Sequence, residues 1–103
     1  MTMPTRLVAD GGQTALNVTA ATNYGTGLMT VYRVIVEVSA AAVSYVVDSA
    51  GTTQSAANTV LTIPASTAVG TVYTLNWPCI QGLALVPGAG VTLAMSYSVG
   101  NQG

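Results

Sequence analysis

The sequence contains no histidine and only one cysteine, Cys79, and this excludes most catalytic and metal chemistry. Without histidine, no Ser–His or Cys–His nucleophile pair can form. One cysteine without histidine excludes a zinc site, and no ligand spacing supports a calcium site. General acid–base catalysis would need two carboxylates side by side. The only carboxylates, Asp10, Glu37 and Asp48, lie on separate predicted elements, so we expect no enzyme activity, no metal and no cofactor.

Charge is nearly absent. Only 5% of residues are charged, about a fifth of the fraction usual in soluble domains, and the two basic residues are Arg6 and Arg33. Two arginines cannot neutralise a run of phosphates or form a polybasic membrane patch, so no nucleic acid and no membrane partner is expected. A monomer with so little charge is poorly protected against association. We therefore expect copies of the chain or a larger assembly to cover much of the surface.

Long apolar runs are missing as well. No stretch of about 18 apolar residues is present, so no transmembrane helix is expected. The N-terminal sequence MTMPTRLVADGG lacks the charged and apolar regions of a signal peptide. A single cysteine cannot form an internal disulfide, which fits synthesis in a reducing cytoplasm. We interpret Cys79 as a small buried hydrophobic residue.

Val, Thr and Gly dominate what remains, a composition typical of strands joined by turns. Alternating apolar and polar residues predict about eight short strands at intervals of roughly 8–12 residues, and this pattern is typical of an all-β fold, either a sandwich or a barrel. The predicted strands are residues 6–9, 14–21, 28–38, 43–48, 59–63, 71–77, 80–86 and 91–98. We expect one domain over residues 7–99, an extended arm over 1–6 and a flexible tail over 100–103. Residues 23–27 are interpreted as a glycine-bearing loop.

The last three strands should form a β-meander, with the segment Pro-Gly-Ala-Gly at 87–90 reversing the chain. On the first of them, Trp77 shares a face with Tyr73 and Leu75, which favours a core anchor over an interface anchor. The longest strand, residues 28–38, should place Tyr32, Val34, Val36 and Val38 on one face, and Met29, Val31, Arg33, Ile35 and Glu37 on the other. A helix over 28–42 competes, but β-branched residues disfavour it. For the three carboxylates we expect structural roles instead of catalytic ones. Asp10 should form a turn, Asp48 should cap the end of a strand, and Glu37 should lie on a solvated face.

Two segments carry a resemblance to a known class of proteins. The opening PTRLVADGGQTALNVTAAT and the closing WPCIQGLALVPGAGVTLAMSYS, with its pattern W-P-C … V-P-G-x-G … L … S-Y, resemble small virion structural proteins of tailed bacteriophages. Residues 40–58 match nothing specific. The resemblance implies a small β-sandwich or jelly roll. We therefore expect an all-β fold, an antiparallel β-sandwich of jelly-roll-like type, made in the cytoplasm of the host bacterium. The resemblance also implies many copies on the virion, as a decoration or cement protein on the capsid surface, with no catalytic residues.

We therefore expect a homotrimer that binds the major capsid protein across subunit junctions and stabilises the shell by mass action. The extended arm could add to a neighbouring sheet edge. The interface residues expected from these arguments are Thr2, Met3, Pro4, Thr5, Arg6, Arg33, Glu37 and Trp77. The alternative is a tail-tip or fibre module that recognises a host-surface glycan, which an exposed Trp77 beside Asn76 would favour. A β-sandwich adaptor unrelated to phages is the third hypothesis.

Overall fold

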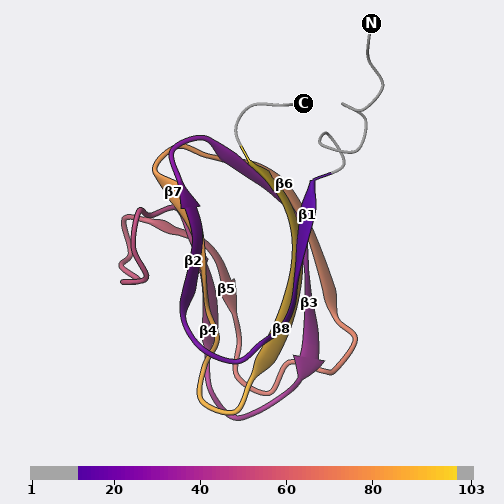
Figure 1. Ribbon diagram of the computed structural model, residues 1–103. Coiled ribbons are helices and arrows are strands. Elements are labelled where there is room, and N and C mark those ends of the chain that lie inside the picture. Colours follow the sequence, from indigo (N-terminus) through magenta and orange to yellow (C-terminus); the bar gives the residue numbers. More distant parts are fainter. Residues whose placement is uncertain (1–11, 100–103) are drawn as a thin grey trace, which may run out of the picture.

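The computed structural model describes residues 12–99, which form two antiparallel four-stranded sheets packed face to face (Figure 1). No helix occurs within these residues, so none could span a membrane, and the competing helical interpretation of residues 28–42 is excluded. The strands are β1 (Gln13–Val18), β2 (Thr22–Thr26), β3 (Met29–Val38), β4 (Ser44–Val47), β5 (Thr59–Ile63), β6 (Val72–Cys79), β7 (Gly82–Val86) and β8 (Thr92–Val99).

Strand pairing identifies the sandwich as a jelly roll. Sheet I has the order β1-β8-β3-β6 and sheet II the order β2-β7-β4-β5. The first strand pairs with the last, the second with the seventh, the third with the sixth and the fourth with the fifth. The chain is thus a long antiparallel ribbon, bent between β4 and β5 and wrapped so that β3 also meets β8 and β4 meets β7. This wrapping is the double Greek key of a jelly roll, and it confirms the predicted fold class.

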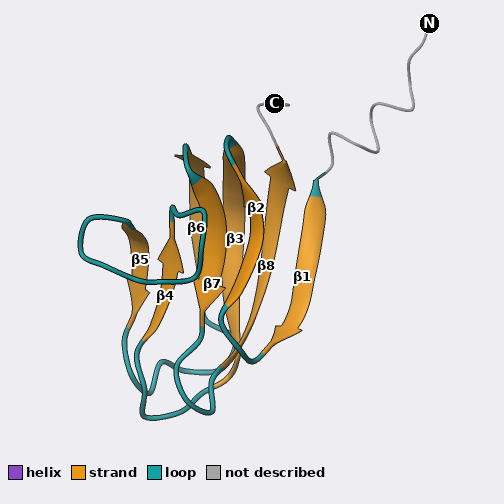
Figure 2. Cartoon of the chain, turned by 60° about the vertical axis from the view of Figure 1, so that its left-hand side comes forward, coloured by secondary structure: helices purple, strands orange, loops and turns teal. Residues whose placement is uncertain are grey.

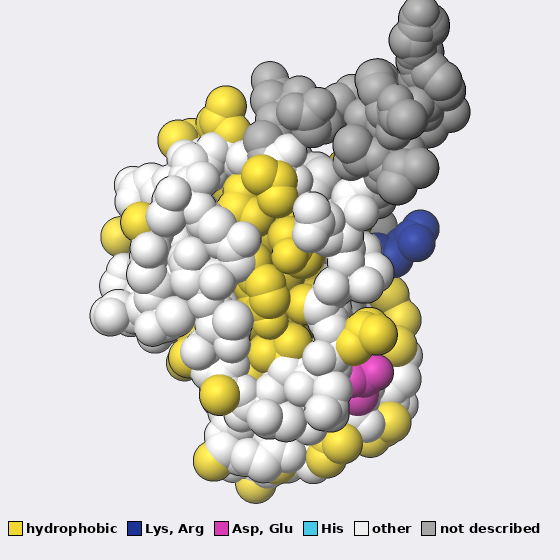
Figure 3. Space-filling view, in the orientation of Figure 1, with side chains coloured by type: hydrophobic (Ala, Val, Ile, Leu, Met, Phe, Trp, Pro, Cys, Tyr) yellow, Lys and Arg dark blue, Asp and Glu magenta, His cyan; other side chains and the backbone are white. Residues whose placement is uncertain are grey.

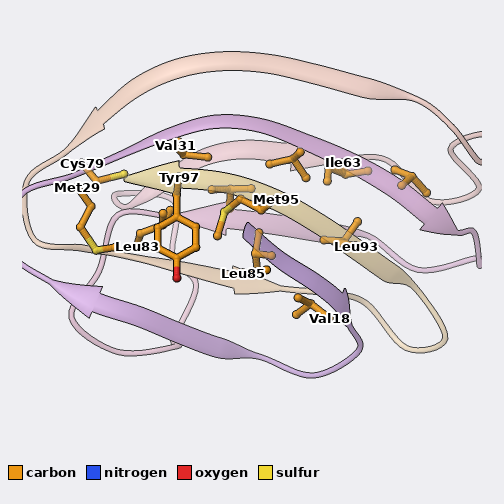
Figure 4. Close-up of a cluster of buried hydrophobic side chains, with 14 of the residues drawn as sticks. Val18, Met29, Val31, Ile63, Cys79, Leu83, Leu85, Leu93, Met95 and Tyr97 are labelled. Carbon is orange, nitrogen blue, oxygen red and sulfur yellow. The ribbon is translucent and has the colours of Figure 1, made fainter. Parts of the chain in front are cut away.

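The core lies between the sheets and consists of aliphatic and sulfur-containing side chains with one tyrosine (Figure 4). Val31, Leu83, Leu85 and Leu93 have no solvent exposure. Each such side chain contributes about 1.5–3 kcal/mol by leaving water. Leu93, Met95 and Tyr97 of β8 face this core, as the alternation predicted.

The predicted meander is wrong. β6 lies in sheet I, β7 in sheet II and β8 again in sheet I, so none of the three pairs with another. The segment 87–90 therefore carries the chain from one sheet to the other instead of closing a hairpin (Figure 2). Turn residues specify that the chain reverses, but they do not specify which strand receives it. Long-range pairing with β1, β2, β3 and β4 decides this instead.

Two further strand predictions need correction. β2 was interpreted as a loop because its Asn and Gly are rare in strands, yet it pairs with β7 through a register shift beside Gly25. In β3 the register against β8 shifts between Val31 and Arg33, so an extra residue, Tyr32, interrupts the alternation. Met29 and Val31 are therefore buried together with Val34 and Val36, which the predicted alternation placed on opposite faces. The predicted strand over residues 6–9, the arm over 1–6 and the tail over 100–103 lie outside the described residues.

Candidate functional site

The outer face of sheet I carries a row of apolar side chains that crosses all four strands. Val72 on β6 is paired with Ile35 on β3, and Ile35 is paired with Ala94 on β8. Leu16 on β1 lies in the bulge opposite Ala94 and completes this apolar row. Leu16 is 70% exposed and Val72 is 50% exposed. Ile35 is partly exposed and Ala94 is buried, so the row is exposed chiefly at its two ends. Exposed apolar side chains aligned on one sheet face are typical of a surface that meets a partner.

A second row, beside the apolar row, is polar and contains Arg33. Thr74, Arg33, Ser96 and Thr14 are neighbours in register across the sheet. The apolar row, together with Arg33, Ser96 and Thr14 of the polar row, lines a shallow depression of about 260 Å³. Arg33 is the only basic residue within residues 12–99, so the depression combines an apolar floor with one guanidinium. Figure 3 shows how few charged side chains the described surface presents on the side in view.

Glu37 lies on the same strand as Arg33 and has a structural contact. One of its carboxylate oxygens, Oε1, accepts a hydrogen bond of 3.3 Å from the backbone N–H of Asn17. Asn17 has a φ of 55° and belongs to the β1 bulge, where the ladder to β8 is interrupted. The carboxylate therefore satisfies a donor that the bulge withdraws from the ladder.

Trp77 is at a different place, at the open edge of the sandwich between β6 of sheet I and β5 of sheet II. It is 52% exposed, so the interpretation as a core anchor is wrong. The neighbouring Asn76 has a φ of 48°, and the register between β3 and β6 shifts at this position, which breaks the alternation that predicted burial. Tyr73 and Leu75, which precede the shift, do pack against the core.

The exposed tryptophan lines a depression of about 210 Å³, which we call the Trp77 pocket. Its other lining residues are Asp48, Ala57, Asn58, Thr59, Val60 and Gln81. They come from the end of β4, the β4–β5 connection, β5 and the β6–β7 turn. Apart from the alternative with an exposed tryptophan, no local pattern predicts this grouping, because its residues come from two separate stretches, 48–60 and 77–81.

Asp48 holds the β6–β7 turn beside this pocket. Its Oδ1 accepts hydrogen bonds from the backbone N–H groups of Ile80, Gln81 and Gly82 at 3.1, 2.7 and 3.2 Å, and its Oδ2 accepts from Ile80 at 3.0 Å. The prediction that Asp48 caps the end of its own strand is therefore wrong, because its carboxylate caps a distant turn instead.

Cys79 is buried at the end of β6, as interpreted from the sequence. Burial, together with the smaller effect of the negative charge of Asp48, raises the pKa of its thiol to about 12. A thiol with this pKa is protonated and unreactive at neutral pH. Within the described residues, no group of three or more potential metal ligands occurs.

The expected interface residues are thus divided between locations. Arg33 and Glu37 share the outer face of sheet I. Trp77 lies on β6, the edge strand of that sheet, and lines a different depression from Arg33. Thr2, Met3, Pro4, Thr5 and Arg6 lie outside the described residues.

No family model, no curated protein and no solved structure matches this chain.

Proposed function

We propose that this chain is a structural protein of a tailed-phage virion that decorates the capsid and stabilises it by binding across junctions between capsid subunits. The observation that carries the proposal is the apolar row on the outer face of sheet I. Its partners in this proposal are the major capsid protein and further copies of the chain, in a homotrimer on the capsid surface.

The apolar row supports a protein partner because its side chains gain free energy only when a complementary surface covers them. Hydrophobic transfer supplies about 25 cal/mol for each Å² of apolar surface removed from water. The single guanidinium of Arg33, beside the row, can set orientation by a hydrogen bond or ion pair with a carboxylate of the partner. An apolar centre with one arginine is the usual composition of an interface core.

Fold and charge support the same proposal by analogy. Jelly rolls occur in viral capsid and lectin domains, although a shared fold does not by itself establish a shared function. The formal net charge of −1 gives little electrostatic protection against self-association. A protein that works in a dense shell has no need of such protection, because its apolar surface is covered there.

The first experiment is quantitative mass spectrometry of purified virions separated into heads and tails. The proposal predicts many copies per head. A few copies confined to the tail would contradict it in favour of a receptor-binding module, and absence from both fractions would refute the virion assignment altogether. Native mass spectrometry of the free protein tests the trimer, and a monomer at micromolar concentration would refute that part.

A matched pair of leucines tests the docking face. Leu16 lies in the apolar row, whereas Leu28 is also half exposed but lies between β2 and β3, outside the row. Leu16→Gln places an amide in the proposed interface and should weaken capsid binding about tenfold or more. Leu28→Gln is the control and should bind as the unaltered chain does. Equal affinity of the two variants would exclude the outer face of sheet I as the docking surface.

The second candidate, a tail-tip or fibre module that recognises a host-surface glycan, draws on a different observation. Trp77 is half exposed beside Asn76, which is the feature expected of that alternative. The Trp77 pocket could bind a sugar whether the protein lies on the head or on the tail.

A further inference from the structure

The Trp77 pocket joins an exposed aromatic side chain to polar groups in one concavity, and the proposed capsid function does not use it. Trp77 carries the only indole of the chain, and about half of its surface is open to solvent. Asp48, Asn58, Thr59 and Gln81 contribute carboxylate, carboxamide and hydroxyl groups around it. Convergent polar groups beside an apolar surface are the usual composition of a small-molecule site.

Hydrogen bonds fix the wall that the β4–β5 connection contributes. The Asn58 side chain accepts from the Ser55 N–H at 2.9 Å and donates to the Thr53 carbonyl at 2.9 Å. The Thr59 hydroxyl donates to the Ser55 carbonyl at 2.6 Å and accepts from the Gln54 side chain at 2.8 Å. A ligand therefore meets a wall whose shape is already set, and binding does not have to order this loop.

The opposite wall is also fixed, and it offers groups for recognition. Asp48 holds the backbone of the β6–β7 turn at residues 80–82, so the exposed Gln81 side chain projects from an anchored position. The Asp48 Oδ2 accepts one hydrogen bond, from the Ile80 N–H, and has a further lone pair available. Gln81 can both donate and accept, which suits the hydroxyl groups of a polyol.

Charge decides which kind of polyol fits. Asp48 is the one ionisable residue that lines the pocket, and Arg33, the one basic residue among residues 12–99, lines the depression on the outer face of sheet I. An anionic sugar would therefore meet a carboxylate and no counter-charge. A neutral sugar can place its hydroxyl groups against Gln81 and Asp48 and its apolar C–H face against the indole.

We propose that the Trp77 pocket is a binding site for a neutral hexopyranose, stacked on Trp77 and hydrogen-bonded by Gln81 and the free Oδ2 lone pair of Asp48. The depression of about 210 Å³ accommodates one sugar unit. The site is independent of the proposed capsid function, and it rests on the second candidate function, glycan recognition, for which it names the sugar class and the residues that bind it. It would let a decorated particle adhere to a glycan-bearing cell surface.

The experiment is a fluorescence titration of the full chain, because Trp77 is its only tryptophan and the emission reports on this pocket alone. Methyl hexopyranosides are added in the millimolar range, and a saturable blue shift with protection from acrylamide quenching is expected as the sugar covers the indole. The corresponding uronic acids should bind at least about tenfold more weakly, because they add a carboxylate beside Asp48. Equal binding of neutral and acidic sugars would overturn the assigned recognition.

Variants separate the site from general destabilisation. Gln81→Ala keeps the fluorophore and should weaken binding about tenfold, and Trp77→Ala, measured by calorimetry, should abolish it. Trp77→Phe keeps an aromatic face and should retain part of the affinity. Leu16→Gln, on the outer face of sheet I, is the matched control and should bind sugar normally, so failure here is distinct from failure of the capsid proposal. Absence of any saturable signal, together with no binding to immobilised neutral oligosaccharides, would refute the site.

Discussion

The carboxylate of Asp48 should be worth several kcal/mol to the fold, and replacing it tests how the β6–β7 turn is held. Asp48→Ala removes the acceptor of three backbone N–H groups. Ile80 and Gln81 are exposed, so water replaces the carboxylate there at little cost. Gly82 is buried, and its unsatisfied N–H should cost about 1–3 kcal/mol. With the lost charge-assisted bonds, we expect a total of about 3 kcal/mol.

Asp48→Asn is the informative partner variant, because it keeps an acceptor oxygen but loses the charge. Charge-assisted hydrogen bonds are roughly twice as strong as neutral ones, so about half of the loss should be recovered. Urea unfolding followed by the Trp77 emission measures both values, with the m-value checked for constancy. Hydrogen exchange at residues 80–82 should accelerate in both variants. A loss below about 0.5 kcal/mol for Asp48→Ala, or equal losses for the two variants, would refute the reasoning.

Two further outcomes follow from buried positions near this turn. Gly82→Ala should destabilise the fold by about 3 kcal/mol or more, because the backbone φ at Gly82 is 152° and an added Cβ would overlap the carbonyl oxygens of Ser49 and Gly25. Thermal unfolding measures this loss of stability, and an unchanged Tm would contradict the prediction. Burial raises the pKa of Cys79 from 9.0 to about 12. Between pH 9 and pH 12 the unfolded chain binds fewer protons than the folded one. The buried, protonated Cys79 thiol therefore contributes fully to stability below pH 9, and this contribution is lost as the pH rises toward 12. Urea unfolding across this range should show a slope that Cys79→Ala reduces, and an identical slope in the variant would refute the assignment.

The outer face of sheet I shows why the candidate surfaces could not be predicted. Local alternation identified Leu16, Ile35, Val72 and Ala94 as members of strands, but no local signal places these four residues in one row. Each comes from a different strand, and their alignment depends on which strands pair and in which register. Pairing between distant strands is a property of the wrapped ribbon, not of any window of residues.

Irregularities in strand register likewise made the faces of single side chains unpredictable from the sequence. Strict alternation placed Trp77 with Tyr73 and Leu75, and it placed Met29 and Val31 with Arg33. An irregularity between Val31 and Arg33, matched on β6 near Asn76, changed both groupings, because Trp77 is exposed and Met29 and Val31 are buried. One inserted residue reverses the side-chain face for the rest of a strand. Nothing in the local sequence marks Tyr32 as the extra residue, since it is a good strand former.

By itself, the sequence determined the class of the protein. The composition rich in Val and Thr and the alternation of apolar and polar residues were enough to predict an all-β sandwich or barrel, and seven of the eight described strands were located within a few residues. Local composition controls local conformation, so these features could be read directly. Only the tertiary structure decided that β6, β7 and β8 separate between the sheets and that Asp48 caps a turn 32 residues away. It also decided that Trp77 faces solvent, because contacts across the whole chain fix each of these features.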